Sequence, residues 1–149
     1  LSSESKLEIR GMLREVTEIE SIGDSCYNLA RTINRKRSGG NDFTEKQYEH
    51  IHQMMQLTSD ALAQMIAVVE DEHHVVDVNK SFNIENEINN YRAQLKNQNV
   101  VDVNNKEYDY QMGVHYMDII GECEKLGDYV VNVVEARTNV KEKKTGDNR

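Results

Sequence analysis

Apolar residues recur every three or four positions along most of the chain, which is the spacing of amphipathic helices. The longest such stripe runs through residues 4–37 and ends at "NRKRSGGND", where three cations and two glycines are typical of a helix C-terminus. We therefore expect one long helix here, with its stripe in the core. The stripe consists of Ile9, Met12, Leu13, Val16, Ile19, Ile22, Cys26, Leu29, Ala30 and Ile33.

A second helix is predicted to begin at "TEKQ", because Thr44 and Gln47 have the spacing of a capping box. Its apolar positions alternate between steps of three and four residues, as in the seam of a helical bundle. They are Tyr48, Ile51, Met55, Thr58, Leu62, Met65 and Val69.

The start of the third helix is less distinct, because the junction "EDEHHVVDVNKS" contains neither glycine nor proline. Asp77 or Asn79 is the predicted cap. The seam then continues at Ile84, Ile88, Tyr91 and Leu95.

A polar break at "KNQNVVDVNNKE" is expected to precede the last helix, with Asn104 and Glu107 placed like a capping box. Residues 139–149 form a polar tail, for which we expect a frayed structure. The stripe of this last helix consists of Tyr116, Ile119, Ile120, Cys123, Leu126, Val130, Val133 and Val134.

Composition supports an all-α protein built as an antiparallel bundle of about four long helices. The 149 residues include no proline and eight glycines, whereas sheets and long loops usually need more turn residues. A formal charge of −8 repels a phosphate backbone, so nucleic acid is not an expected partner. No stretch approaches the roughly 20 apolar residues of a membrane span. We therefore expect a soluble segment without direct membrane insertion.

The chain carries few of the features that mark an enzyme. It has no nucleophile motif, no glycine-rich phosphate loop and no Cys-x-x-Cys pair. Cys26 and Cys123 lie among apolar helical residues, and we interpret them as reduced core thiols of a cytosolic protein, a disulfide between them being the alternative. An enzyme is therefore not expected.

Two Glu-x-x-His elements resemble those of di-iron carboxylate bundles, in which the elements lie on different helices and face one centre. Glu49 and His52 form the first element, and Glu70 and His73 form the second. Both fall on the second predicted helix, 21 residues and thus about 31 Å apart along its axis. The two elements therefore cannot share a metal.

One segment contains an arrangement that should weaken its own helix. Glu20 and Asp24 are like charges at i and i+4, which repel by roughly 0.2 to 0.5 kcal/mol, and Gly23 costs about another 0.5 to 1 kcal/mol relative to alanine. The arrangement occurs twice, which indicates two copies of one unit. A shift of 104 positions lays Glu18, Glu20, Gly23, Asp24 and Asn28 on Glu122, Glu124, Gly127, Asp128 and Asn132.

On a helical wheel each carboxylate pair lies at the flank of its apolar stripe, partly exposed. Two carboxylates and a neighbouring amide are oxygen ligands of the kind that hard or borderline cations accept. We therefore predict one metal site at Glu20 and Asp24 and a second at Glu124 and Asp128. A plain solvated helix face is the alternative for the carboxylates, and a close helix crossing is the alternative for each glycine.

The segments "IESIGDSCYNLART" and "CEKLGDYVVNVVEA" resemble the signature of PhoU-like domains, in which a hydrophobic helix carries Glu-x-x-x-Asp. The stretch "IENEINNYRAQLKNQNV" is similar to the preceding helix of that domain. The resemblance covers residues 44–138 as one complete three-helix unit and residues 4–37 as the last helix of a preceding unit. It implies a single PhoU-like bundle over residues 1–138.

In this family the Glu-x-x-x-Asp motifs can hold metal ions, iron or zinc clusters among them. The resemblance therefore implies divalent, iron or zinc ions at the four carboxylates already named. The sequence departs from the usual pattern because the arginine often found between glutamate and glycine is absent. Ser21-Ile22 and Lys125-Leu126 stand in its place.

PhoU-like domains occur as stand-alone negative regulators of phosphate uptake and as cytoplasmic C-terminal portions of bacterial sodium/phosphate cotransporters. The absence of a starting methionine, the incomplete first unit and the divergent motif lead us to expect the second setting. The expected location is then the cytoplasmic side of the inner membrane, with the transmembrane part of the same chain as partner. A homo-oligomer is a further expectation, and a metal-dependent helical enzyme or a scaffold bundle is the remaining alternative.

Overall fold

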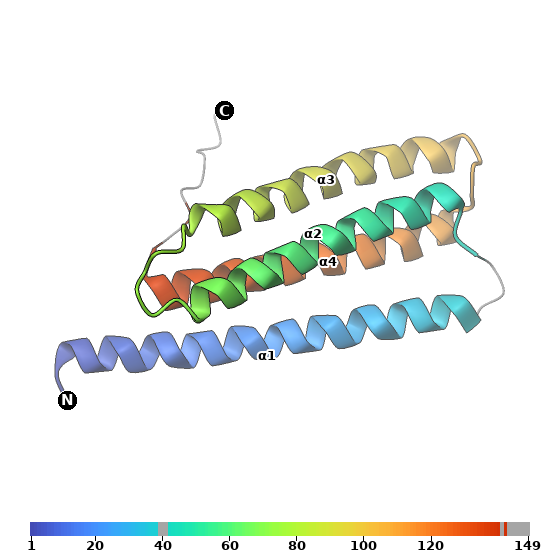
Figure 1. Cartoon of the computed structure of the whole chain (residues 1–149). Coiled ribbons are helices and arrows are strands. Elements are labelled where there is room, and N and C mark those ends of the chain that lie inside the picture. The colour runs from blue at the N-terminus through green and yellow to red at the C-terminus, as the bar shows by residue number, and fades with distance from the viewer. Residues whose placement is uncertain (39–41, 141, 143–149) are drawn as a thin grey trace, which may run out of the picture.

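The computed structural model describes residues 1–38, 42–140 and 142, and in these residues it contains helices and no strand. Four helices form an antiparallel bundle (Figure 1), which confirms the predicted fold class. They are α1 (Ser3–Ser38), α2 (Glu45–Val69), α3 (Asn79–Asn104) and α4 (Tyr110–Thr138).

Helix α4 is the central element of the bundle. It packs against each of the other three helices, and α2 also packs against α3, whereas α1 touches α4 alone among the described helices. All eight residues of the stripe predicted for α4 are buried. Because apolar residues are buried along most of this helix, the other three helices can all pack against it.

The predicted capping box at the start of α2 is confirmed. The amide of Gln47 donates to the Thr44 hydroxyl at 3.1 Å, and the Thr44 amide donates to the Gln47 side chain at 2.9 Å. Ile51, Thr58 and Met65 of the predicted α2 seam are buried, and the other predicted positions are replaced by their preceding neighbours. Tyr48 and Met55 are exposed, and the inward positions include Met54.

The predicted cap of α3 is wrong, because the N-cap is Val78, which makes no side-chain capping hydrogen bond. Asp77 precedes the helix and accepts a hydrogen bond from the Asn79 amide at 3.0 Å. The predicted break before the last helix begins too early, because α3 continues through Asn104 and only residues 105–109 separate it from α4. The polar residues of that stretch lie largely on the solvent side of the helix. Asp109, rather than Asn104 and Glu107, caps α4 by accepting from the Met112 amide at 2.7 Å.

The largest difference from the sequence prediction concerns α1. Ile9, Met12, Leu13, Val16 and Ile19 were expected in the core and are 45 to 63% exposed. The cause is that α1 has a single neighbour and turns only part of the predicted stripe toward α4. Ile22 and Leu29 are buried as predicted, and Ile33 packs against the core. The line of residues that faces α4 includes Gly11, Glu18, Ile22, Ser25 and Leu29.

Cys26 and Ala30 belong to the same exposed side of α1, so the prediction that Cys26 is a core thiol is wrong. Cys123 is buried as expected, and burial raises the pKa of its thiol to about 11. Both cysteines are free, which excludes the alternative of a disulfide between them in this structure. Of the predicted polar tail, residues 141 and 143–149 lie outside the described part of the chain.

The two motif glycines have different surroundings. A Cβ at Gly127 would approach the Ile88 side chain to 3.3 Å, and Ile88 is fully buried. A Cβ at Gly23 would meet nothing within 4 Å. The close helix crossing considered for both glycines therefore exists at Gly127 only.

We predict opposite effects of alanine at these two glycines. Gly23→Ala should raise the free energy of unfolding by about 0.5 to 1 kcal/mol, because alanine restricts the unfolded chain and favours a helix. Gly127→Ala should lower it, because the new methyl group would press on the fully buried side chain of Ile88. Urea unfolding of both variants measures the difference. Equal effects at the two positions would contradict this account of the crossing.

Candidate functional site

The duplicated motif joins α1 to α4. Asn132 donates to the Glu18 carboxylate at 3.2 Å, and the hydroxyl of Ser25 donates to Glu122 at 2.8 Å. Glu18 and Glu122 are equivalent residues of the two copies, and each accepts a hydrogen bond from the opposite helix, although the donors Asn132 and Ser25 are not equivalent. Some residues of the repeated motif therefore form a polar contact between two antiparallel helices.

The first predicted metal pair lies on an open surface. Glu20 and Asp24 are both exposed, as the helical wheel indicates for the flank of the stripe. In the described part of the chain neither carboxylate has an ion pair. No neighbouring helix covers them, since α1 contacts α4 alone.

The second pair lies beside the seam between α3 and α4. The Arg92 guanidinium from α3 forms an ion pair with Glu124 at 3.1 Å, and both side chains are about one third exposed or less. Asp128 is exposed and lies next to Glu85, again from α3. The equivalent motifs thus differ in that only the second receives charged groups from a neighbouring helix.

Glu85 is an acidic side chain at an interior position, with 8% of its surface exposed. Burial raises the pKa of its carboxyl to about 8, and the adjacent carboxyl groups of Glu142 and Asp128 add to the effect. The Asn89 side chain donates to Glu85 at 3.4 Å and acts in the opposite direction. At neutral pH the folded protein therefore holds Glu85 mainly as the neutral acid.

The structure does not bring the four predicted ligands together. Within residues 1–38, 42–140 and 142, no three histidine, cysteine, aspartate or glutamate side chains are grouped so that they could hold a metal ion. Each motif offers two carboxylates by itself. A cation bound there would complete its coordination with water, as magnesium-like ions commonly do.

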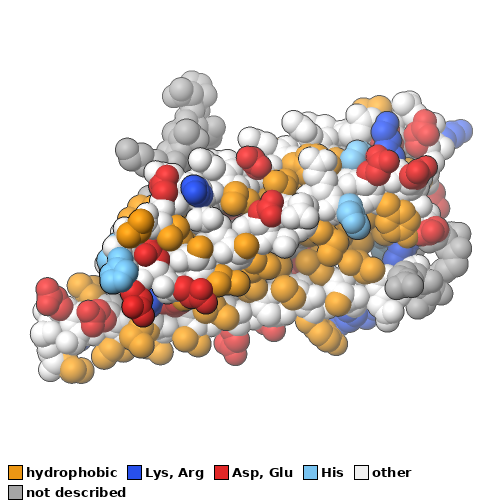
Figure 2. Space-filling view, in the orientation of Figure 1, with side chains coloured by type: hydrophobic (Ala, Val, Ile, Leu, Met, Phe, Trp, Pro, Cys, Tyr) orange, Lys and Arg blue, Asp and Glu red, His pale blue; other side chains and the backbone are white. Residues whose placement is uncertain are grey.

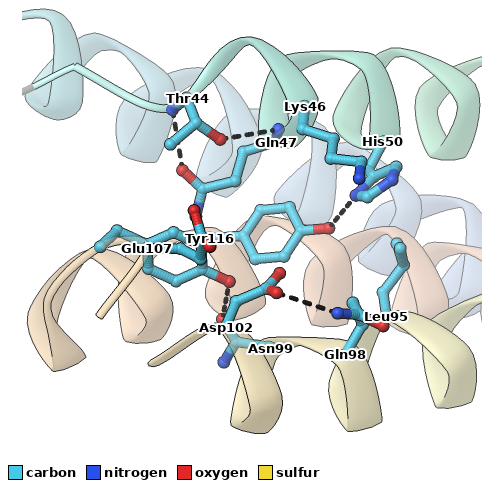
Figure 3. Close-up of a pocket in the computed structure, with 11 residues that line it drawn as sticks. Thr44, Lys46, Gln47, His50, Leu95, Gln98, Asn99, Asp102, Glu107 and Tyr116 are labelled. Atoms are coloured by element: carbon cyan, nitrogen blue, oxygen red, sulfur yellow. Dashed lines mark hydrogen bonds between the residues drawn. The ribbon is translucent and has the colours of Figure 1, made fainter. Parts of the chain in front are cut away.

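A separate polar cavity of about 220 Å³ lies where α2 begins and α3 ends (Figure 3). The ring nitrogen Nδ1 of His50 and the hydroxyl of Tyr116 are hydrogen bonded at 2.9 Å. Tyr108 donates to Asn99 at 2.7 Å. Burial raises the pKa of both tyrosines, so their hydroxyls stay protonated at neutral pH.

The charges around this cavity are mixed and do not favour one class of ligand. Lys46 contributes a positive charge, whereas Asp102 and Glu107 contribute negative ones. Gln98 already donates to Asp102 at 2.9 Å. Several of these polar groups bond one another, but among the described residues the buried Nε2 of Gln47 has no hydrogen-bond partner.

Sequence reasoning missed three residues that shape these sites. His50 is not part of either Glu-x-x-His element, and nothing in its spacing indicated its bond to Tyr116. Glu85 and Arg92 lie seven residues apart on α3, and this spacing could have placed them on one helix face. Their position opposite Asp128 and Glu124 depends on the register between two helices, which periodicity does not supply.

Together, the fold and the site define an all-helical bundle organised around a duplicated acidic helix. A sequence model of the PhoU domain matches residues 51–136, which is more than half of the chain. The chain therefore belongs to the PhoU domain family, which is a regulatory, non-enzymatic family. The match covers most of α2 and all of α3, and it extends nearly to the end of α4.

Two further comparisons found no similar protein. Among curated proteins and among solved structures, none matches the chain. Among the described residues, no helix has the length and apolar character needed to cross a bilayer.

Glu85→Gln should change how stability depends on pH. The folded state keeps the Glu85 proton up to about pH 8, whereas the unfolded chain releases it near 4.5, so the stabilisation is full below 4.5 and is lost as pH rises to about 8. Glutamine cannot ionise, so at pH 9 the variant should be more stable than the parent by about 1 to 3 kcal/mol.

Urea unfolding at pH 5 and pH 9 measures this effect, with Glu87→Gln as the matched control on the exposed side of α3. The control should leave the pH profile unchanged. Parallel pH profiles for the parent and Glu85→Gln would contradict the raised pKa.

Proposed function

We propose that this chain is the cytoplasmic regulatory module of a sodium-dependent inorganic phosphate transporter in the bacterial inner membrane. The PhoU domain match across residues 51–136 carries the proposal, because it makes a phosphate-uptake regulatory role the expected one. The transmembrane part of the same transporter chain is the proposed partner. Regulation then consists of a shift in the transporter's conformational equilibrium when the module binds one state better than the other.

The second motif is the proposed metal site of this module. Glu124 and Asp128 lie one helical turn apart on α4 and would hold a divalent, iron or zinc ion between them. The ion would supply positive charge at this acidic site. It would thereby bridge the carboxylates to an anion such as phosphate. Arg92 already pairs with Glu124 at 3.1 Å, so metal binding would weaken this contact between α3 and α4.

The same chemistry is proposed, more weakly, for Glu20 and Asp24. These carboxylates have the equivalent positions on α1, but α3 contributes no residue near them because it does not contact α1. A cation at this site would thus be coordinated by two carboxylates and water alone. We expect it to bind a cation less tightly than the second motif.

Zinc binding tests the metal sites. We expect Zn²⁺ to raise the unfolding free energy of the chain, by about 2.7 kcal/mol at a concentration 100 times the dissociation constant. Glu124→Gln with Asp128→Asn should remove most of this gain, because the ligand oxygens lose their charge. Isothermal titration and thermal unfolding measure the two effects.

Two further double variants complete that experiment. Glu20→Gln with Asp24→Asn reports on the first motif, and Glu45→Gln with Glu87→Gln removes two exposed acidic groups elsewhere as a control. Unchanged zinc binding in the Glu124 and Asp128 variant would contradict the assignment. The regulatory proposal would then rest on the family match alone.

Phosphate uptake tests the regulatory role. We expect that supplying the chain to bacterial cells, whose sodium/phosphate cotransporter lacks its own PhoU-like region, will change the initial rate of sodium-dependent uptake of labelled phosphate several-fold. Each free-energy difference of 1.4 kcal/mol between transporter states corresponds to a tenfold population shift.

The matched strain takes up phosphate through a different transporter. An effect confined to that strain would indicate a stand-alone regulator of phosphate uptake. No effect in either strain, with the chain shown to be folded by circular dichroism, would contradict a regulatory module of this kind.

A further inference from the structure

The cavity between the start of α2 and the end of α3 contains a buried hydrogen-bond donor without an acceptor. Gln47 is 2% exposed, and its Nε2 has no hydrogen-bond partner among the described residues. The capping box fixes the direction of this side-chain amide, because Oε1 accepts from the Thr44 amide at 2.9 Å. Nε2 therefore faces the cavity that Gln47 lines (Figure 3). A buried donor of this kind is destabilising until some group accepts its hydrogen.

Two side chains act on the same hydroxyl group inside the cavity. Burial raises the pKa of Tyr108 and the Asp102 carboxylate adds to this rise, whereas the Gln47 amide acts in the opposite direction. The amide is near the hydroxyl but makes no hydrogen bond to it, and Tyr108 donates instead to Asn99 at 2.7 Å. Asp102 accepts from Gln98 at 2.9 Å, and a carboxylate has capacity for more than one such bond. A donor and an acceptor are thus both available to a ligand.

The charges of the cavity lining, which as a sum favour no class of ligand, are separated in space. Lys46 lies on α2 beside Gln47, whereas Asp102 lies on α3 and Glu107 follows that helix. None of the three charged groups forms an ion pair in the described part of the chain. Figure 3 shows the α2 residues on one side of the Tyr116 ring and Asp102 on the other. The α2 wall therefore donates hydrogen bonds, and the opposite wall accepts them.

The helix ends reinforce this polarity. Helix α2 begins at this end of the bundle and α3 ends there (Figure 1), so the partial positive charge of the first and the partial negative charge of the second agree with the side chains. Figure 2 shows basic and acidic side chains together over the same end. All lining residues belong to the segment 44–116, so the cavity does not involve α1.

The volume and exposure of the cavity limit what can bind. About 220 Å³ corresponds to about seven water molecules at about 30 Å³ each, and thus to a ligand with a similar number of non-hydrogen atoms. Lys46 is exposed and Asp102 is half-buried, so a ligand can reach both from solvent. An anion alone would face the carboxylates of the acceptor wall, and a cation alone would leave the Gln47 amide unsatisfied.

We propose that this cavity binds a small zwitterionic amino acid. Its carboxylate accepts from Nε2 of Gln47 and pairs with Lys46, and its ammonium group donates to Asp102. Each charge of the ligand then meets the opposite charge, and the orphan amide gains its acceptor. The site uses none of the carboxylates of the proposed metal sites. It goes beyond the proposed function and does not depend on it.

Two-dimensional ¹⁵N–¹H NMR tests the site, because the side-chain amide of Gln47 gives its own signals. The probes are glycine, L-alanine, L-serine and L-threonine, which span the size that the cavity admits. We expect at least one of them to shift these signals, with a dissociation constant of about 0.1 to 1 mM for a ligand this small.

Isosteric analogues of the amino acid that binds best test its two ends separately. For L-alanine, lactate replaces the ammonium group by a hydroxyl, and L-alaninamide replaces the carboxylate by an amide. Each analogue should bind about tenfold or more weakly, because it loses a charge-assisted hydrogen bond at one wall. Glycerol, which is uncharged, should not bind.

Gln47→Glu and Asp102→Asn each change one wall. Glutamate keeps the capping box but presents a carboxylate to the carboxylate of the ligand, and asparagine removes the charge that faces the ammonium group. Either variant should weaken binding about tenfold or more, followed through the backbone amides of residues 44–50. Glu45→Gln is the matched control, since Glu45 is exposed in the first turn of α2 and does not line the cavity. Circular dichroism confirms that each variant is folded.

Three results would overturn the proposal. If none of the four amino acids shifts the Gln47 signals, the cavity holds water alone. Equal binding of an amino acid and either analogue excludes recognition of a zwitterion. Unchanged affinity in both Gln47→Glu and Asp102→Asn places the ligand elsewhere on the chain. Each result leaves the metal and transport experiments unaffected.

Discussion

The packing of α4 against all three other helices is the constraint on which the rest of the structure depends. Ile119, Ile120, Val133 and Val134 are at most 1% exposed, and full burial of such a side chain is worth about 1.5 to 3 kcal/mol. Because α4 fills the space between the other helices, α2 and α3 can be amphipathic and still bury their inward apolar residues. The position of the second acidic motif follows from this arrangement, since its flank of α4 is the one that meets α3.

The sequence predicted the helices well because their signal is local. Apolar periodicity located all four, and the spacing of Thr44 and Gln47 identified a capping box that forms with both bonds. The break before α4 was placed too early, because a run of asparagine, lysine and glutamine is also compatible with the exposed face of a helix. Asp109 was therefore overlooked as the cap that actually starts α4.

The exposure of α1 and the ion pair at the acidic site could not be predicted, because both depend on which helices contact each other. The stripe of α1 has the same periodicity as that of α4, so the pattern gave no reason to expect Val16 at 63% exposure and Ile120 at 0%. The same holds for the acidic site. The motif identified Glu124, but its ion pair with Arg92 arises from the register between α3 and α4.

The polar contact between α1 and α4 also affects the dynamics of the chain. Ser25 and Asn132 hold the two helices together partly through carboxylates, and Arg14 adds an ion pair to Glu135 at 3.3 Å. Of the apolar side chains of α1, Ile22 and Leu29 are buried, whereas α4 is lined with buried apolar residues along most of its length. Regions with fewer buried apolar contacts open at a lower free energy than the global unfolding step. We therefore expect α1 to open as a separate unit, with amide hydrogens that exchange with solvent before those of the three-helix core.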